Sequence, residues 1–97
     1  MNQTDRIVPA PNVVATPLPG ELVLLQLDTG YYFGLDEIGS RCWVLLVTEG
    51  LSIADAAVTI SAEYEVGLAQ AQDDLLALVA SLEKAQLVRP VPGSGAG

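Results

Sequence analysis

The sequence predicts an α+β domain in which a small antiparallel sheet comes first and three helices follow, packed against that sheet. Two observations lead to this prediction. Apolar residues alternate with a period of two between residues 21 and 28, and from residue 37 onward they recur every three or four residues. A chain of 97 residues has room for one domain with a single core.

Two strands are predicted before residue 30. The β-branched segment 12–17 is an edge strand, which a turn at Pro19-Gly20 closes. Residues 21–28 form the second strand, with Val23, Leu25 and Leu27 on one face and Leu22, Leu24 and Gln26 on the other. Both faces are largely apolar, so we expect the Leu22/Leu24 face to meet another element or a ligand.

The third predicted strand runs from Tyr31 to Leu35 and follows the turn Asp28-Thr29-Gly30. Gly30 supplies the positive φ that a tight hairpin requires. Tyr31, Phe33 and Leu35 share one face of this strand. Phe33 and Leu35 are the stronger core candidates.

Three helices are predicted after the strands. Asp36 caps a first helix over residues 37–49, which Gly50 ends. Ser52 and Asp55 form a pair like a capping box for a second helix that ends near residue 64. The third helix, residues 68–86, contains no Gly or Pro after its start. Its predicted core stripe is Leu68, Ala71, Leu75, Leu78, Val79 and Leu82.

The chain divides into a predicted flexible arm (1–11), a folded domain (12–90) and a disordered tail (91–97), because both ends are rich in Pro, Gly or Ser. The longest apolar runs, residues 42–47 and 75–80, are too short to span a membrane. The start of the chain has no secretory signal pattern, so we expect a cytoplasmic protein.

The composition argues against nucleic-acid binding. Twelve acidic residues against four scattered cations give a net charge of −8, and a phosphate backbone is repelled by such a field. An acidic surface keeps an apolar small domain soluble, and it also attracts basic peptides.

Catalytic and metal-binding residues are not expected. The chain has no histidine, and its one cysteine, Cys42, lies mid-helix in an apolar run next to Trp43, where both are expected in the core. Neighbouring carboxylates on a helix point about 100° apart, so the pairs Asp36-Glu37 and Asp73-Asp74 do not converge on one atom. We therefore predict a protein that is not an enzyme and has no cofactor.

The segments DTGYYFGLDEIGSRCW (28–43) and EGLSIADAAVTISAEYEV (49–66), followed by a long apolar helix, resemble the PqqD-like family of peptide-recognition domains. These are the recognition elements that bind leader peptides of ribosomally made, post-translationally modified natural products. The resemblance covers about residues 18–88. It implies a winged-helix-like fold: a three-stranded antiparallel sheet followed by three helices.

The resemblance also implies a site. A leader peptide adds as a further strand to the third strand and packs beside the third helix, which agrees with the way short free strand edges recruit peptides. The peptide-binding residues expected on this basis are Leu22, Leu24, Tyr31, Tyr32, Phe33, Gly34, Gln72, Asp73, Leu76, Val79, Ala80 and Glu83.

A separate, acidic chain of this length is similar to the recognition protein of lasso-peptide pathways, which implies a separate cysteine leader peptidase as partner and a lasso cyclase in the same pathway. Three alternatives stay open. They are a PqqD-type chaperone for a different peptide-modifying enzyme, a winged-helix DNA-binding protein, and an acidic carrier protein modified at Ser40.

Overall fold

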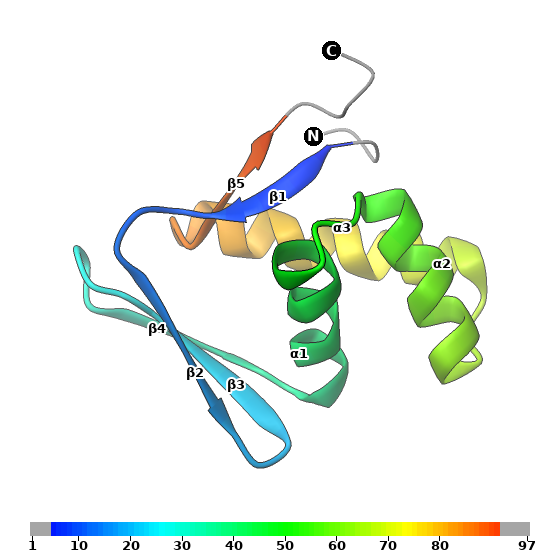
Figure 1. Ribbon diagram of the computed structural model, residues 1–97, viewed down its shortest axis with the longest axis horizontal. Coiled ribbons are helices and arrows are strands. Elements are labelled where there is room, and N and C mark those ends of the chain that lie inside the picture. Colours follow the sequence, from blue (N-terminus) through cyan, green and yellow to red (C-terminus); the bar gives the residue numbers. More distant parts are fainter. Residues whose placement is uncertain (1–4, 92–97) are drawn as a thin grey trace.

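The structure, a computed structural model, describes residues 5–91, and Figure 1 shows how the elements are arranged. A three-stranded antiparallel sheet has the order β2-β3-β4, and a separate two-stranded sheet pairs β1 with β5. Helices α1, α2 and α3 follow β4 along the chain. The fold class predicted from the sequence is therefore confirmed, with one small sheet added.

The main sheet consists of β2 (Val13–Leu18), β3 (Glu21–Gln26) and β4 (Tyr31–Leu35). Its two turns each use a glycine with φ +75°, Gly20 and Gly30, as the hairpin geometry requires. The register pairs Leu24 with Phe33 and Leu22 with Leu35, so these four side chains share one face. That face packs on the core.

The opposite face of the sheet is open. Leu25 pairs with Tyr32 on this outer face, where the Tyr32 side chain is 69% exposed. Leu24, the residue before Leu25, points to the other face and is fully buried. The expectation that the Leu22/Leu24 face meets another element is confirmed, because both side chains belong to the core cluster.

The first helix starts where the sequence predicts. Asp36 is its N-cap, with Oδ1 accepting a hydrogen bond from the Gly39 backbone N–H at 2.8 Å. The α-helical part, α1 (Glu37–Trp43), continues as the π-helical turn η1 (Val44–Thr48), in which the Glu49 N–H bonds to the Val44 carbonyl. Gly50, at φ +70°, then ends the helix.

Helices α2 (Ile53–Tyr64) and α3 (Leu68–Lys84) pack against each other. Ser52 caps α2 through a hydrogen bond from the Asp55 N–H to its hydroxyl, as predicted. The predicted core stripe of α3 is confirmed for Ala71, Leu75, Val79 and Leu82, which are buried. It is wrong at its first position, since Leu68 is exposed, and Leu78 is only half-buried.

The strands β1 (Arg6–Pro9) and β5 (Val88–Val91) were not anticipated by the sequence, which placed residues 6–9 in an arm. They pair antiparallel, and the buried side chains of Ile7 and Val88 join the core. Both strands are sheet edges, where Pro9 and Pro90 are tolerated. The predicted arm and tail fall in part on residues 1–4 and 92–97, which lie outside the described residues.

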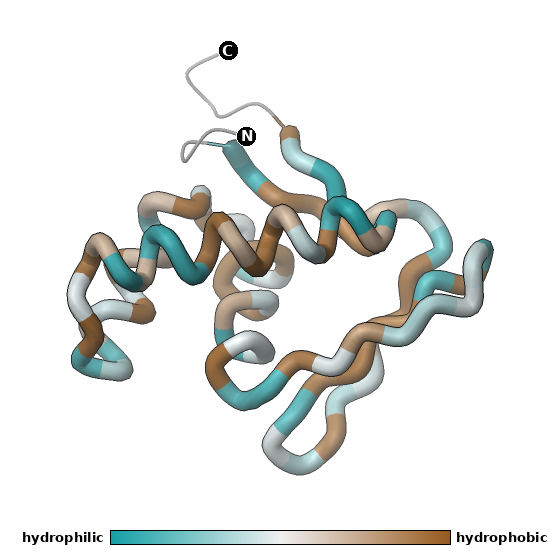
Figure 2. Tube along the Cα trace, turned by 180° about the vertical axis from the view of Figure 1, so that it is seen from behind, coloured by the Kyte–Doolittle hydropathy of each residue, from teal (hydrophilic) through white to brown (hydrophobic). Residues whose placement is uncertain are grey.

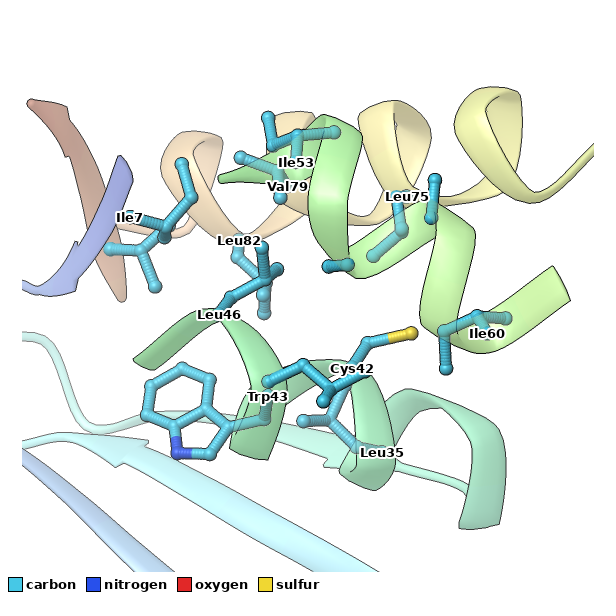
Figure 3. Close-up of a cluster of buried hydrophobic side chains, with 14 of the residues drawn as sticks. Ile7, Leu35, Cys42, Trp43, Leu46, Ile53, Ile60, Leu75, Val79 and Leu82 are labelled. Carbon is cyan, nitrogen blue, oxygen red and sulfur yellow. The ribbon is translucent and has the colours of Figure 1, made fainter. Parts of the chain in front are cut away.

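The core lies between the helices and the sheet. Figure 3 shows Trp43 of α1 beside the sheet and Leu46, Val79 and Leu82 stacked above it, with Ile7 closing one side. On the surface, Arg41 of α1 donates two hydrogen bonds to Glu63 of α2, at 2.9 and 2.7 Å, which ties the two helices together. The prediction that Trp43 is a core residue is confirmed.

Candidate functional site

One edge of the main sheet is free. Within residues 5–91, β4 pairs only with β3, so the backbone groups along its other side have no neighbouring strand. Such an edge accepts an added strand through main-chain hydrogen bonds. In Figure 2 the sheet lies below α3, and the β3–β4 turn lies beside the C-terminal end of that helix.

A groove separates the free edge from α3. It has a volume of about 560 Å³, and we call it the strand–helix groove. Its β-hairpin side is formed by Thr29, Tyr31 and Phe33, and its helix side by Ser81, Lys84, Ala85 and Gln86. A peptide strand on β4 would thus place alternate side chains toward the helix, which is how strand addition gains sequence selectivity.

A second hollow, of about 300 Å³, lies where α1, α2 and α3 meet, and we call it the three-helix pocket. Its apolar lining includes Ile38, Cys42, Ile60, Leu75 and Leu78, and two carboxylates, Asp36 and Asp74, also line it. Asp36 directly follows β4, so this pocket lies next to the end of that strand.

Gln26 connects the sheet to Gln86, a residue of the groove. It is the one buried polar side chain within residues 5–91, and its Nε2 donates to the Gln86 carbonyl at 2.7 Å while its Oε1 accepts from the Asp28 N–H at 3.0 Å. The side chain therefore joins β3 to the residues that follow α3. Because Gln86 lines the groove, this hydrogen bond holds hairpin and helix at a set separation.

The predicted strand residues divide into two groups. Tyr31 and Phe33 line the groove, Gly34 is exposed on β4, and Tyr32 points to the outer face of the sheet. Leu22 and Leu24 are core residues with almost no exposed surface. A peptide on the β4 edge cannot touch these two side chains in this conformation.

The predicted α3 residues line neither hollow. The groove and the pocket use Asp74, Leu78, Ser81 and Ala85, which lie on one flank of the buried stripe. Successive residues turn by 100°, so the predicted residues Gln72, Leu76 and Glu83 lie on the opposite flank. Asp73 and Ala80 are exposed farther round that side, and Val79 is fully buried.

Sequence reasoning missed the polar rim of the groove. Thr29 belongs to the turn, and Lys84, Ala85 and Gln86 form the end of α3 and the residues after it. No signal in the sequence singles out this flank of α3, because each flank of the core stripe carries one leucine among polar residues, Leu78 on this side and Leu76 on the other.

Among residues 5–91, the linings of the groove and the pocket include one thiol, Cys42, and no histidine. Cys42 is buried, as predicted, and its burial, together with the Asp36 and Asp74 carboxylates, raises the pKa of the thiol to about 11. A thiol with so high a pKa is a poor nucleophile at neutral pH. Within residues 5–91, no three Cys, Asp or Glu side chains form a group able to hold a metal ion, and no helix is long and apolar enough to cross a membrane.

We predict that Cys42 reacts slowly in the folded protein. Alkylation by iodoacetamide at pH 7.5 should be roughly a hundredfold slower than in denaturant, because the raised pKa lowers the thiolate fraction and burial restricts access. The folded pKa lies above the unfolded one, so the contribution of the thiol to stability is complete below the ordinary thiol pKa. It is lost as the pH rises toward 11.

Denaturant midpoints measured at pH 8 and pH 10.5 test the second part of this prediction. The Cys42→Ala variant serves as control, because it keeps the other groups that titrate in this range. The wild-type protein should lose more stability between the two pH values than the variant does. Equal losses would contradict the assigned thiol pKa.

The chain matches a known protein family and solved structures. The family model of coenzyme PQQ synthesis protein D (PqqD) matches residues 21–88. The structure of TbiB1 in complex with the TbiA(beta) leader peptide is 38% identical in sequence with a TM-score of 0.78, covering 84% of this chain and 93% of that one. The structure of a lasso peptide synthetase B1 complexed with the leader peptide is 29% identical in sequence with a TM-score of 0.81, and the match covers 88% of this chain and 99% of that one. The curated proteins gave no match.

Proposed function

Because this chain belongs to the PqqD family, we propose that it binds the leader peptide of a ribosomally synthesised precursor as a strand added to β4. The observation that carries the proposal is the free β4 edge beside the strand–helix groove. The two matched structures, which have this fold, both contain a leader peptide, and this supports the assignment.

PqqD-like recognition domains are non-catalytic binding domains. Within the described part of the chain, the groove offers backbone hydrogen-bonding groups, the aromatic side chains of Tyr31 and Phe33, and the cation of Lys84. These groups position a peptide; they do not activate a nucleophile or stabilise a developing charge. Binding of an extended peptide is thus the chemistry that the groove supports.

The proposed partners are the enzymes that process the precursor peptide. The chain would present the bound precursor to a separate cysteine leader peptidase of a lasso-peptide pathway, upstream of the lasso cyclase, and the match to a lasso peptide synthetase B1 supports this. The alternative is service to another peptide-modifying enzyme, which the PQQ-synthesis description of the family supports. Leader removal by each candidate enzyme, with and without the chain, distinguishes the two.

DNA binding is the weaker candidate. Helix α3 carries Asp73, Asp74 and Glu83 against a single cation, Lys84, so it lacks the positive face with which a recognition helix approaches phosphates. A gel shift that persists at physiological salt would favour this class over peptide binding.

Leader binding can be tested together with the orientation of α3. We predict that a fluorescein-labelled TbiA(beta) leader, or the leader of a precursor gene beside this chain's own gene, gives saturable anisotropy. Ser81→Trp should weaken binding about tenfold, because the indole fills the strand–helix groove. The neighbouring change Ala80→Trp introduces the same side chain on the predicted flank and should have little effect.

The two tryptophan variants decide between the flanks. If Ala80→Trp weakens binding and Ser81→Trp does not, the peptide lies on the flank that the sequence predicted and the groove is not the site. If no leader from either source binds the wild-type protein, the proposed function is wrong.

A further inference from the structure

The three-helix pocket lies next to the end of strand β4. Strand β4 ends at Leu35, and the next residue, Asp36, lines the pocket. A strand advances about 3.3 Å per residue, so a peptide paired with β4 reaches the pocket within a few residues of the strand's end. The strand–helix groove and this pocket also follow each other along α3, through Ser81 and then Leu78.

The inside of the pocket is apolar. Leu75 and Cys42 are buried in its lining, and Figure 3 shows the Cys42 sulfur directed between Leu75 and Ile60. Ile38 is 44% exposed beside it although it is a large aliphatic residue. A hollow of about 300 Å³ is at the lower limit of ligand-pocket sizes, which fits one large side chain better than a separate small molecule.

The two carboxylates of the pocket have no cationic partner within residues 5–91. Asp36 accepts from the Gly39 N–H, and Asp74 accepts from the Gln70 side chain at 2.8 Å, so each carboxylate keeps acceptor capacity. Arg41, the nearest cation along the chain, is engaged with Glu63 and Glu49. Both aspartates contribute to the raised pKa of Cys42, which shows that their field reaches the apolar lining.

We propose that the three-helix pocket binds a large apolar side chain of the leader peptide that is followed or preceded by a lysine or arginine. The apolar side chain enters the pocket, and the cation pairs with Asp36 and Asp74 at its opening. This inference rests on the proposed function and adds a selectivity for charge.

The opposite end of the binding surface has the opposite charge. Among residues 5–91, Lys84 is the only charged residue that lines the strand–helix groove, whereas Asp36 and Asp74 are the charged residues that line the pocket. A peptide with an acidic side chain toward Lys84 and a basic one toward the pocket therefore fits in one direction along β4.

The test is a peptide scan. The probe is a labelled leader that binds the wild-type protein, with each position replaced in turn by Lys, Gln and Glu, measured by anisotropy at 50 and 300 mM salt. We expect one position next to an apolar residue at which Lys binds about threefold more tightly than Gln, with the difference reduced at high salt.

Matched variants assign this preference to the pocket. Asp74→Asn should abolish it, and so should Asp36→Asn, which keeps the helix cap because asparagine caps as well as aspartate. Asp73→Asn makes the same change in net charge at an exposed position outside the pocket and should leave the preference unchanged.

The outcomes separate this inference from the proposed function. A leader that binds well with no position preferring Lys overturns the pocket assignment and leaves leader binding in place. An equal loss of the preference in Asp73→Asn and Asp74→Asn also overturns it, because the general acidic field then explains the effect. Absence of binding by every leader overturns both proposals.

Discussion

Replacing Phe33 with alanine should weaken leader binding roughly 10- to 100-fold, whereas Tyr32→Ala should change it by no more than about twofold. The two residues are neighbours on β4, so a strand added to this edge passes both. Phe33 lines the strand–helix groove, whereas Tyr32 lies on the outer face of the sheet opposite Leu25. Of the two side chains, only Phe33 is placed to contact the side chains of a peptide in the groove.

The size of the effect follows from burial. Fully burying an aromatic side chain is worth about 1.5–3 kcal/mol, and each 1.4 kcal/mol is a factor of ten in the dissociation constant. Phe33 is already half-buried in the free protein, and its ring lies 6.4 Å from that of Tyr31. The peptide would cover the remaining surface of both rings, so the loss on truncation should fall in the lower part of that range.

Measurements of folding show whether a change in affinity comes from the binding site or from loss of structure. Both variants should retain the wild-type circular dichroism spectrum, and the fluorescence of Trp43, the only tryptophan, reports whether the core is intact. Phe33→Leu, which keeps an apolar wall, should recover part of the lost affinity. If Tyr32→Ala weakens binding as much as Phe33→Ala, the peptide contacts the outer face and the groove assignment is wrong.

The elements that the sequence predicted well are those determined by local chemistry. The hairpin turn at Gly30 and the bounds of β4 agree with the prediction, because a glycine at positive φ and an alternating aromatic segment leave few alternatives. The caps Asp36 and Ser52 are equally local, since each side chain bonds to a backbone N–H three residues ahead.

What the sequence did not reveal depends on contacts between distant segments. Strands β1 and β5 have four residues each, include prolines, and are strands because they pair with each other across the length of the chain. Hydropathy alone also did not distinguish the two faces of β3, because both are largely apolar. The core face is the one that carries the polar residue Gln26. Its side-chain amide can be buried there because it donates to the Gln86 carbonyl and accepts from the Asp28 N–H.

The candidate site shows the same division. Its strand side was predicted in part, since the family resemblance implied Tyr31 and Phe33 as peptide-binding residues and the alternation of β4 places both on one face. Its helix side was not, because the two flanks of the α3 core stripe have similar hydropathy and only the position of the sheet selects one of them. The groove residues Thr29 and Gln86 are brought together by the fold, with 56 residues between them in the sequence.

Leu24→Ala should destabilise the domain by about 2–5 kcal/mol, which is a large part of the roughly 5–15 kcal/mol that holds a small domain folded. Leu24 is fully buried on the core face of β3, opposite Phe33, and its removal leaves a cavity between the sheet and the helices. Leu25→Ala, one residue along on the half-buried outer face, should cost about 1 kcal/mol or less.

Denaturant unfolding followed by Trp43 fluorescence measures both changes, and leader binding at a temperature where both variants are folded shows what Leu24 does for the site. Since Leu24 contacts the core and not the groove, the folded Leu24→Ala protein should bind the leader nearly as well as the wild type, and any loss should follow the unfolded fraction. A variant with wild-type stability and weakened binding would instead make Leu24 a peptide contact. That result would require the sheet to open on binding, because in the structure this side chain has no surface to offer.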